Sequence, residues 1–173
     1  RIAGMCDGVR CDMAMLVMND VFERTWGEYA GPPPPVDFWE EVIPSVKKDY
    51  PDLLFMAEVY WDLEWPLMQQ GFDCCYDKRL YDRLLGGNAQ TVRLHLNADP
   101  SYQERLVRFL ENHDEQRCAK VFPQGRLQAA SVAVATLPGV RLFYEGQIEG
   151  RSVRVSVQLA RGPKEGVNGP LRE

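Results

Sequence analysis

Short apolar runs that alternate with helix-like segments or long loops are the feature that most limits how this chain can fold. The first run closes at 10–15, and the others lie at 53–57, 72–76, 106–110 and 140–144. Strands separated in this way pair in parallel through right-handed crossovers. The alternation predicts the α/β class, and both an open doubly wound sheet and a part of a (β/α)8 barrel fit it. A complete barrel needs about 250 residues, more than the 173 in this chain.

Helical periodicity marks several segments between the runs. One stripe consists of Trp39, Val42, Ile43, Val46 and Tyr50. Asp37, with Glu40 three positions later, predicts an acidic capping box at the start of that helix, and Pro51 predicts its end. Two later stripes consist of Leu80, Tyr81, Leu84 and Leu85, closed by Gly86-Gly87, and of Leu127, Ala130, Val134 and Leu137.

Composition and charge exclude several classes of protein. Hydrophobic residues make up 45% of the chain, which argues against disorder. No apolar stretch approaches the roughly 18 residues that mark a membrane span. A net charge of -5 without a block of Lys or Arg gives no electrostatic footprint for nucleic acid or an anionic membrane. We therefore expect neither as a partner, and the composition leaves the oligomeric state open.

Cysteine usage bears on the cellular compartment. The chain contains Cys6, Cys11, Cys74, Cys75 and Cys118, an odd number, with neither a C-x-x-C motif nor the spacing of a zinc site. We interpret these residues as small buried hydrophobes in a reducing compartment, which predicts a cytoplasmic protein. The chain begins at Arg1 without a signal-peptide pattern, and a signal peptide upstream of Arg1 would change that expectation.

Three short motifs follow one another along the chain. They are Gly8-Val9-Arg10-Cys11-Asp12, Ala57-Glu58-Val59-Tyr60-Trp61 and Phe109-Leu110-Glu111-Asn112-His113-Asp114. In this order they resemble three of the regions that define the alpha-amylase family of glycoside hydrolases and transglycosylases. Segments 71–77 and 137–147 look like later barrel segments of the same family. The resemblance covers roughly residues 4 to 150.

The resemblance implies a partial (β/α)8 TIM barrel, approximately strands 4 to 8, without the N-terminal strands. Residues 1–150 would be the C-terminal portion of the catalytic barrel, and 151–173 a linker or the start of a following segment. The family's earlier Asp…Asn-His region has no counterpart, so the chain looks like a fragment that would be inactive alone. Many family amylases have Lys-His where this chain has Met15 and Leu16, so their substrate preference does not carry over.

The resemblance also assigns roles to individual residues. Asp12 would be the nucleophile, Glu58 the general acid, and Asp114 the carboxylate that steadies the developing oxocarbenium charge. The residues expected to bind substrate are Arg10, Tyr60, Trp61, Asn112 and His113. The implied substrate is an alpha-glucan or a small alpha-glucoside, with no cofactor and no metal. Glu111 occupies a position that varies in the family, and it is left out of the catalytic set.

Residue chemistry supports these roles independently. Retaining glycosidases place a nucleophilic carboxylate and a carboxylic acid about 5 Å apart. Arg10 and Asp12 are two residues apart, so on a strand they share a face, and the guanidinium keeps the carboxylate ionised. Glu58 follows five apolar residues, and partial desolvation favours its proton-donating form. Read locally, Asp12 and Glu58 could be surface carboxylates, Asp114 a helix N-cap before Glu115, and His113 a satisfied core histidine.

Other functions remain open at this point. Within the family, a transglycosylase or isomerase of the maltosyl- or trehalose-forming type would use the same residues. A truncated, non-catalytic carbohydrate-binding protein is a second alternative, although the three intact carboxylates argue against a decayed site. A metal-dependent barrel hydrolase would use Asp12, Glu58, His113 and Asp114 as ligands. That set would suit zinc poorly, because the whole chain has 2 histidines.

Overall fold

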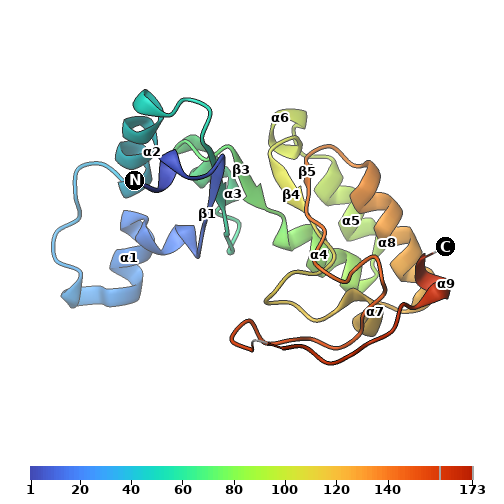
Figure 1. Cartoon of the computed structure of the whole chain (residues 1–173). Helices are drawn as coiled ribbons and strands as arrows, with labels where there is room; N and C mark the ends of the chain where they lie inside the picture. Colours follow the sequence, from blue (N-terminus) through green and yellow to red (C-terminus); the bar gives the residue numbers. More distant parts are fainter. Residues whose placement is uncertain (160, 173) are drawn as a thin grey trace. The chain divides into compact units, whose positions relative to one another are not determined.

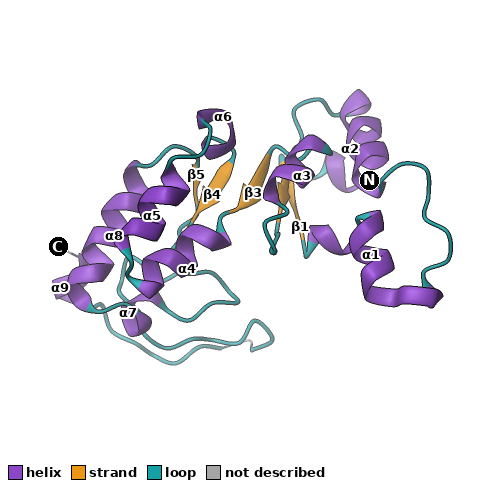
Figure 2. Ribbon diagram, turned by 180° about the vertical axis from the view of Figure 1, so that it is seen from behind, coloured by secondary structure: helices purple, strands orange, loops and turns teal. Residues whose placement is uncertain are grey.

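Two units make up the computed structural model, which describes residues 1–159 and 161–172 (Figure 1). The first unit spans 1–78 and the second begins at Arg79. Each contains parallel strands with helices between them, as Figure 2 shows by secondary structure. The α/β class expected from the alternating runs is therefore observed in both units. No helix among the described residues is long and apolar enough to cross a membrane.

The first unit contains three parallel strands. They are β1 (Gly8–Cys11), β2 (Leu54–Ala57) and β3 (Cys74–Tyr76). β1 pairs with β2 from Gly8↔Leu54 to Cys11↔Ala57, and β2 pairs with β3 at Met56↔Cys74 and Ala57↔Cys75. Because parallel strands end at the same edge of a sheet, the residues that follow them come together there. Asp12 follows β1 and Glu58 follows β2 at this edge.

Helices connect these strands. The α-helices are α1 (Asn19–Trp26), α2 (Phe38–Asp49) and α3 (Glu64–Gln69), and the short 3-10 helices are η1 (Ile2–Gly4), η2 (Ala14–Val17) and η3 (Gly27–Tyr29). α2 is the helix expected from the stripe that starts at Trp39, and it ends just before Pro51. The predicted capping box is wrong, because the Asp37 carboxylate makes no cap hydrogen bond. It accepts instead from the Asn19 backbone N–H at 2.6 Å and from Gln70 Nε2 at 3.0 Å.

Two further expectations for this unit need correction. The first strand does not continue to Met15, because Met13 takes a left-handed conformation with φ 42° and η2 starts at the next residue. The continuous apolar run at 53–57 predicts a strand that is covered on both faces. Leu54 is 56% exposed while Phe55 is buried, so one face of β2 is open at this residue.

Aromatic side chains form the centre of the core of the first unit. Phe72 packs edge-on against Trp39 at 4.9 Å and against Phe55 at 6.4 Å between ring centroids. Gly71, just before Phe72, has φ +111° and lies against Ile43, so a side chain there would be both strained and crowded. This packing fixes α2 against the sheet that carries the polar edge.

The second unit contains two further parallel strands and several helices. β4 (Leu106–Arg108) pairs with β5 (Val140–Arg141) through Val107↔Val140 and Arg108↔Arg141. The helices are α4 (Lys78–Gly86), α5 (Ala89–Leu96), α6 (Pro100–Gln103), α7 (Cys118–Val121), α8 (Gln124–Thr136) and α9 (Gly169–Arg172). α5 and α8 lie side by side in both views (Figures 1 and 2).

The core of the second unit joins the helices to β4. Tyr81 of α4 stacks on Phe109 at 5.6 Å and meets Phe122 edge-on at 6.3 Å. The expected helices at 80–85 and 127–137 are confirmed as α4 and α8, whereas α5 and α6 were not foreseen. The strand expected at 140–144 is shorter, because ladder pairing stops at Arg141. Whether 151–173 is a linker outside the barrel stays a prediction.

Candidate active site

A single guanidinium joins two carboxylates at the polar edge of the first unit. Arg10 Nη1 lies 2.7 Å from Asp12 Oδ1, and Arg10 Nη2 lies 2.9 Å from Glu58 Oε2. Arg10 Nε donates to the hydroxyl of Tyr76 at 3.2 Å, and the guanidinium lies 5.5 Å from the centre of that ring. Strand alternation explains the first contact, since Arg10 and Asp12 are two residues apart. The second contact needs β1 and β2 to be parallel and in register.

Electrostatics keeps this arginine charged. Burial by itself lowers the pKa of Arg10, but hydrogen bonds to Asp12 and Tyr76 and the charge of Glu58 outweigh it. The net effect raises the pKa of Arg10 above its ordinary value. The cation is therefore a fixed positive charge between the two carboxylates.

Glu58 is the more enclosed of the two carboxylates. Its side chain is 4% exposed, against 77% for that of Asp12. Glu58 Oε2 accepts the Met13 backbone N–H at 2.8 Å, and Oε1 accepts the Tyr60 hydroxyl at 3.1 Å. The left-handed turn at Met13 aims that N–H toward Glu58. The two carboxylates thus share one cation but differ strongly in access to solvent.

Backbone hydrogen bonds hold this geometry in place. The Glu58 N–H donates to the Cys11 carbonyl at 3.0 Å, and the Ala14 N–H donates to the Glu58 carbonyl at 2.9 Å. These two hydrogen bonds tie the segment that carries Asp12 to Glu58, one before Asp12 and one after it. Such preorganisation matters because a misplacement of about 1 Å can cost two orders of magnitude in rate.

The two aromatic residues predicted to bind substrate behave differently. Tyr60 turns its hydroxyl to Glu58, as described above. Trp61 has a backbone φ of 65° and is 56% exposed. The guanidinium of Arg24 lies 5.9 Å from the centre of its ring. An exposed indole ring suits stacking on a sugar face. The sugar-binding roles of both residues stay predictions.

The remaining predicted site residues lie together on a loop after β4 in the second unit. Asn112 is buried, and its Oδ1 accepts the backbone N–H groups of Asp114 and Glu115, each at 2.9 Å. His113 Nε2 lies 3.0 Å from Asp114 Oδ2. The alternative in which Asp114 caps a helix is wrong, because the next helix, α7, starts at Cys118. Asn112 shapes the loop from inside, whereas the side chains of His113 and Asp114 keep partial access to solvent.

Sequence reasoning missed several residues around these groups. Tyr76 and Met13 contact Arg10 and Glu58, and Glu111 and Arg117 form a buried ion pair beside the Asp114 loop. Tyr76 could have been found from its position at the end of the apolar run 72–76, which became β3. The backbone role of Met13 had no sequence signal. Within 1–159 and 161–172, no group of three or more His, Cys, Asp or Glu side chains is arranged to hold a metal ion.

The chain is similar to an alpha-amylase of Haloarcula japonica. It is 30% identical to the chain over 161 residues, which cover 88% of the chain and 21% of that protein. The chain thus spans about a fifth of this relative's length. No family model matches the chain.

Solved structures give a consistent result. An alpha-amylase from Lactobacillus plantarum is 25% identical with a TM-score of 0.62, and the match covers 89% of this chain and 38% of that one. A maltogenic alpha-amylase from Thermotoga neapolitana is 25% identical with a TM-score of 0.62, covering 97% and 38%. A debranching enzyme from Nostoc punctiforme is 17% identical with a TM-score of 0.71, covering 99% and 39%. These likenesses confirm the predicted fold, part of a (β/α)8 barrel, over an open doubly wound sheet.

Proposed function

Because the chain belongs to the alpha-amylase family and spans part of its catalytic barrel, we propose that the protein cleaves alpha-linked glucosides with retention of configuration. Its substrates would be starch-like glucans, maltooligosaccharides or small alpha-glucosides. The observation that carries this proposal is the pair of carboxylates on Arg10, one exposed and one enclosed. Two carboxyl groups held close in unlike environments are what a two-step glycosidase requires.

The exposed carboxylate suits the nucleophile. Asp12 Oδ would attack the anomeric carbon and form a covalent glycosyl-enzyme while the bond to the leaving oxygen breaks. Arg10, within 2.7 Å, keeps Asp12 ionised before the attack. The open position of this side chain lets a sugar ring approach it.

The enclosed carboxyl suits the acid and base. Glu58 would give its proton to the leaving glycosidic oxygen and then take a proton from the water that hydrolyses the glycosyl-enzyme. The contacts from Met13, Tyr60 and Arg10 hold both of its oxygens in fixed directions. Asp114 and His113 would bind sugar hydroxyls, and Asp114 would steady the oxocarbenium-like charge of the transition state.

Trapping of the intermediate tests the proposal directly. The protein with its complete barrel is incubated with a 5-fluoro glucosyl fluoride, and its peptides are analysed by mass spectrometry. We expect one added glycosyl group on the peptide that contains Asp12, together with hydrolysis of maltooligosaccharides. The matched control is Asp12→Asn, which should take up no label and lose turnover by about three orders of magnitude, or ~4 kcal/mol.

Two results would contradict the proposal. Label on another residue, with full turnover by Asp12→Asn, would remove Asp12 as the nucleophile. Binding of maltooligosaccharides without label or hydrolysis would favour the carbohydrate-binding alternative. Transfer to sugar instead of water would leave the covalent step intact and change only the acceptor.

A further inference from the structure

A buried carboxylate closes the loop that carries Asp114. Glu111 directly precedes the loop 112–117, and its side chain is fully buried. Its Oε1 lies 3.0 Å from Arg117 Nη1, and its Oε2 accepts the Cys118 backbone N–H at 2.6 Å. One side chain at the start of the loop thus binds both the last loop residue and the first residue of α7. The loop is fastened at its two ends by a single group.

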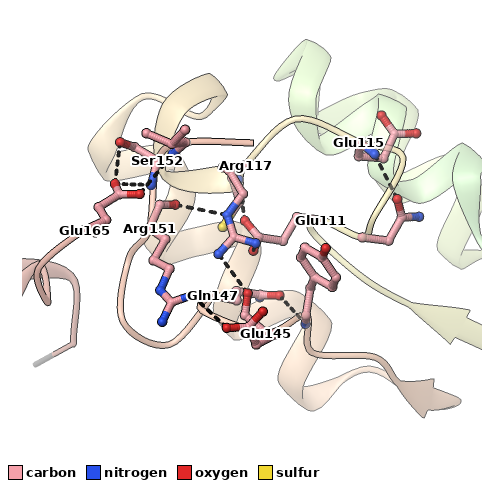
Figure 3. Close-up of polar contacts among 12 residues, drawn as sticks. Glu111, Glu115, Arg117, Glu145, Gln147, Arg151, Ser152 and Glu165 are labelled. Atoms are coloured by element: carbon pink, nitrogen blue, oxygen red, sulfur yellow. Dashed lines mark hydrogen bonds and ion pairs between the residues drawn. The ribbon is translucent and has the colours of Figure 1, made fainter. Parts of the chain in front are cut away.

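Arg117 extends this link to a second loop, as Figure 3 shows. Its Nη2 donates to the Glu145 carbonyl at 2.9 Å, and its Nε donates to the Arg151 carbonyl at 3.3 Å. The guanidinium lies 5.0 Å from the centre of the Tyr144 ring. We call residues 144–152 the strap. The planar fork of Arg117 therefore binds Glu111 on one side and the strap on the other.

The strap is shaped to receive this guanidinium. Gly146 has φ +81°, and a Cβ there would collide with the side chains of Arg117 and Arg151. The strap also closes on itself, since Arg151 Nη1 lies 2.7 Å from Glu145 Oε1. Ser152 donates through its N–H and its hydroxyl to Glu165 at 2.6 and 2.7 Å. These contacts give Arg117 a fixed surface to bind.

Inside the loop, Asn112 fixes the turn that presents Asp114. Its two backbone hydrogen bonds set the local conformation, while Glu111 and Arg117 set the position of the whole loop. A buried ion pair is often no more stabilising than apolar side chains of similar volume. Its value here lies in geometry, because the arginine fork has several fixed donor directions that a lysine lacks.

We infer that Glu111 and Arg117 are positioning residues that place Asp114 by fastening its loop to the strap. The inference rests on the proposed function, because it assigns a consequence in the reaction to Asp114. Neither residue needs to touch substrate. Disturbing the pair should therefore lower kcat, because Asp114 is displaced, and should change KM little.

A double-mutant cycle in the protein with its complete barrel tests this. Arg117→Lys keeps the charge but loses the fork, and we expect kcat on maltooligosaccharides to fall about thirtyfold with KM changed less than about threefold. In an Asp114→Asn background the same substitution should cost less than about twofold, because the group that it displaces is already disabled. Arg126→Lys is the matched control, since the exposed Arg126 of α8 donates to the Leu85 carbonyl, and the same loss of a fork there should leave kcat within about twofold.

The outcomes separate the inference from the proposed function. If the wild-type protein and Asp114→Asn are equally inactive, the proposed function fails. If the wild type is active and Arg117→Lys costs the same factor in both backgrounds, the pair acts independently of Asp114 and the inference is overturned. The same holds if Arg126→Lys is as damaging as Arg117→Lys.

Amide hydrogen exchange gives a readout that does not depend on turnover. Glu111→Gln keeps the shape of the side chain and removes its charge, so it serves as the second variant. We expect the amides of Asp114, Glu115 and Cys118 to exchange at least about tenfold faster in either variant, with α8 unchanged. Unchanged exchange at these amides would overturn the inference. Loss of folding in both variants, seen by circular dichroism, would also overturn it and make the pair a requirement of folding.

Discussion

Arg10 Nη2 lies 2.9 Å from Glu58 Oε2, although the two residues are 48 positions apart in the chain. The contact exists because β1 and β2 are parallel neighbours whose last paired residues are Cys11 and Ala57. It places a permanent cation beside the enclosed carboxyl group as well as beside Asp12.

Arg10→Lys should lower kcat by about ten- to a hundredfold in the protein with its complete barrel, or ~1.4–2.7 kcal/mol. Lysine keeps the positive charge but has no fork to hold Asp12, Glu58 and the Tyr76 hydroxyl together. Steady-state kinetics on a maltooligosaccharide would measure the change. Arg24→Lys is a suitable control, because the guanidinium of Arg24 lies over the Trp61 ring. Equal effects of the two substitutions would deny Arg10 a special role.

Glu58→Gln should affect two kinds of substrate unequally. A sugar alkoxide cannot leave without a proton, whereas a nitrophenolate can. We therefore expect cleavage of a natural oligosaccharide to fall far more than formation of the glycosyl-enzyme from an aryl glucoside, measured by the nitrophenolate burst. Added azide should partly restore turnover of the aryl substrate, since a small anion needs no general base. Equal losses without azide rescue would reassign Glu58 to binding or structure.

The thiols of Cys11 and Cys118 should resist alkylation up to a higher pH than an ordinary cysteine. Burial, with the nearby Glu111, raises the pKa of Cys118 to about 12, and burial raises the pKa of Cys11 to about 11 despite the charge of Arg10. Both thiols stay protonated in the folded protein at pH 8 to 9, and thiolate is the reactive form. Short pulses of iodoacetamide followed by peptide mass spectrometry should label the exposed Cys6 first.

The same shifts make stability depend on pH. In the unfolded chain these thiols ionise near their ordinary value of 9.0, whereas in the folded chain they do not. Their contribution is therefore fully present below pH 9 and is lost as the pH rises toward 11 and 12. Urea unfolding at pH 7.5 and 10 should show the loss, and labelling in urea provides the control. Rapid labelling of Cys118 in the folded protein would contradict its burial. The cytoplasmic location, which was inferred from cysteine usage, stays a prediction.

The 173-residue chain by itself should show little or no turnover of maltooligosaccharides. Within the described residues, β1 pairs with β2 alone and β5 with β4 alone, and open strand edges favour association. A coupled glucose-release assay and light scattering would test both expectations. Robust turnover by a monodisperse monomer would contradict them.

Much of this molecule could be predicted from local sequence. Apolar runs and helical stripes identified the order of the main elements. The runs lie at 53–57, 72–76 and 106–110, and the stripes became α2, α4 and α8. Strand period and hydrophobic period are local properties, so they survive without knowledge of the partner segments. The short motifs, through the family resemblance, also predicted Arg10, Asp12 and Glu58 as site residues, and the parallel strands bring these three side chains together.

Other features depended on contacts between distant residues. Asp37 was expected to cap α2, but the tertiary structure gives its carboxylate to Asn19 and Gln70. Likewise no local motif marks Arg117, and only folding places it between Glu111 and the strap.

The sequence by itself determined the order of the strands, the helices α2, α4 and α8, and which carboxylates follow the strands, since propensity, period and motif act over a few residues. Only the tertiary structure decided how strongly the two carboxylates differ in exposure, which backbone N–H Glu58 accepts, and which arginine is buried. Those properties depend on burial and on hydrogen-bond partners far away in the chain. The apolar run before Glu58 indicates partial burial, and packing sets the size of the difference, which leaves the Asp12 side chain 77% exposed and that of Glu58 4%.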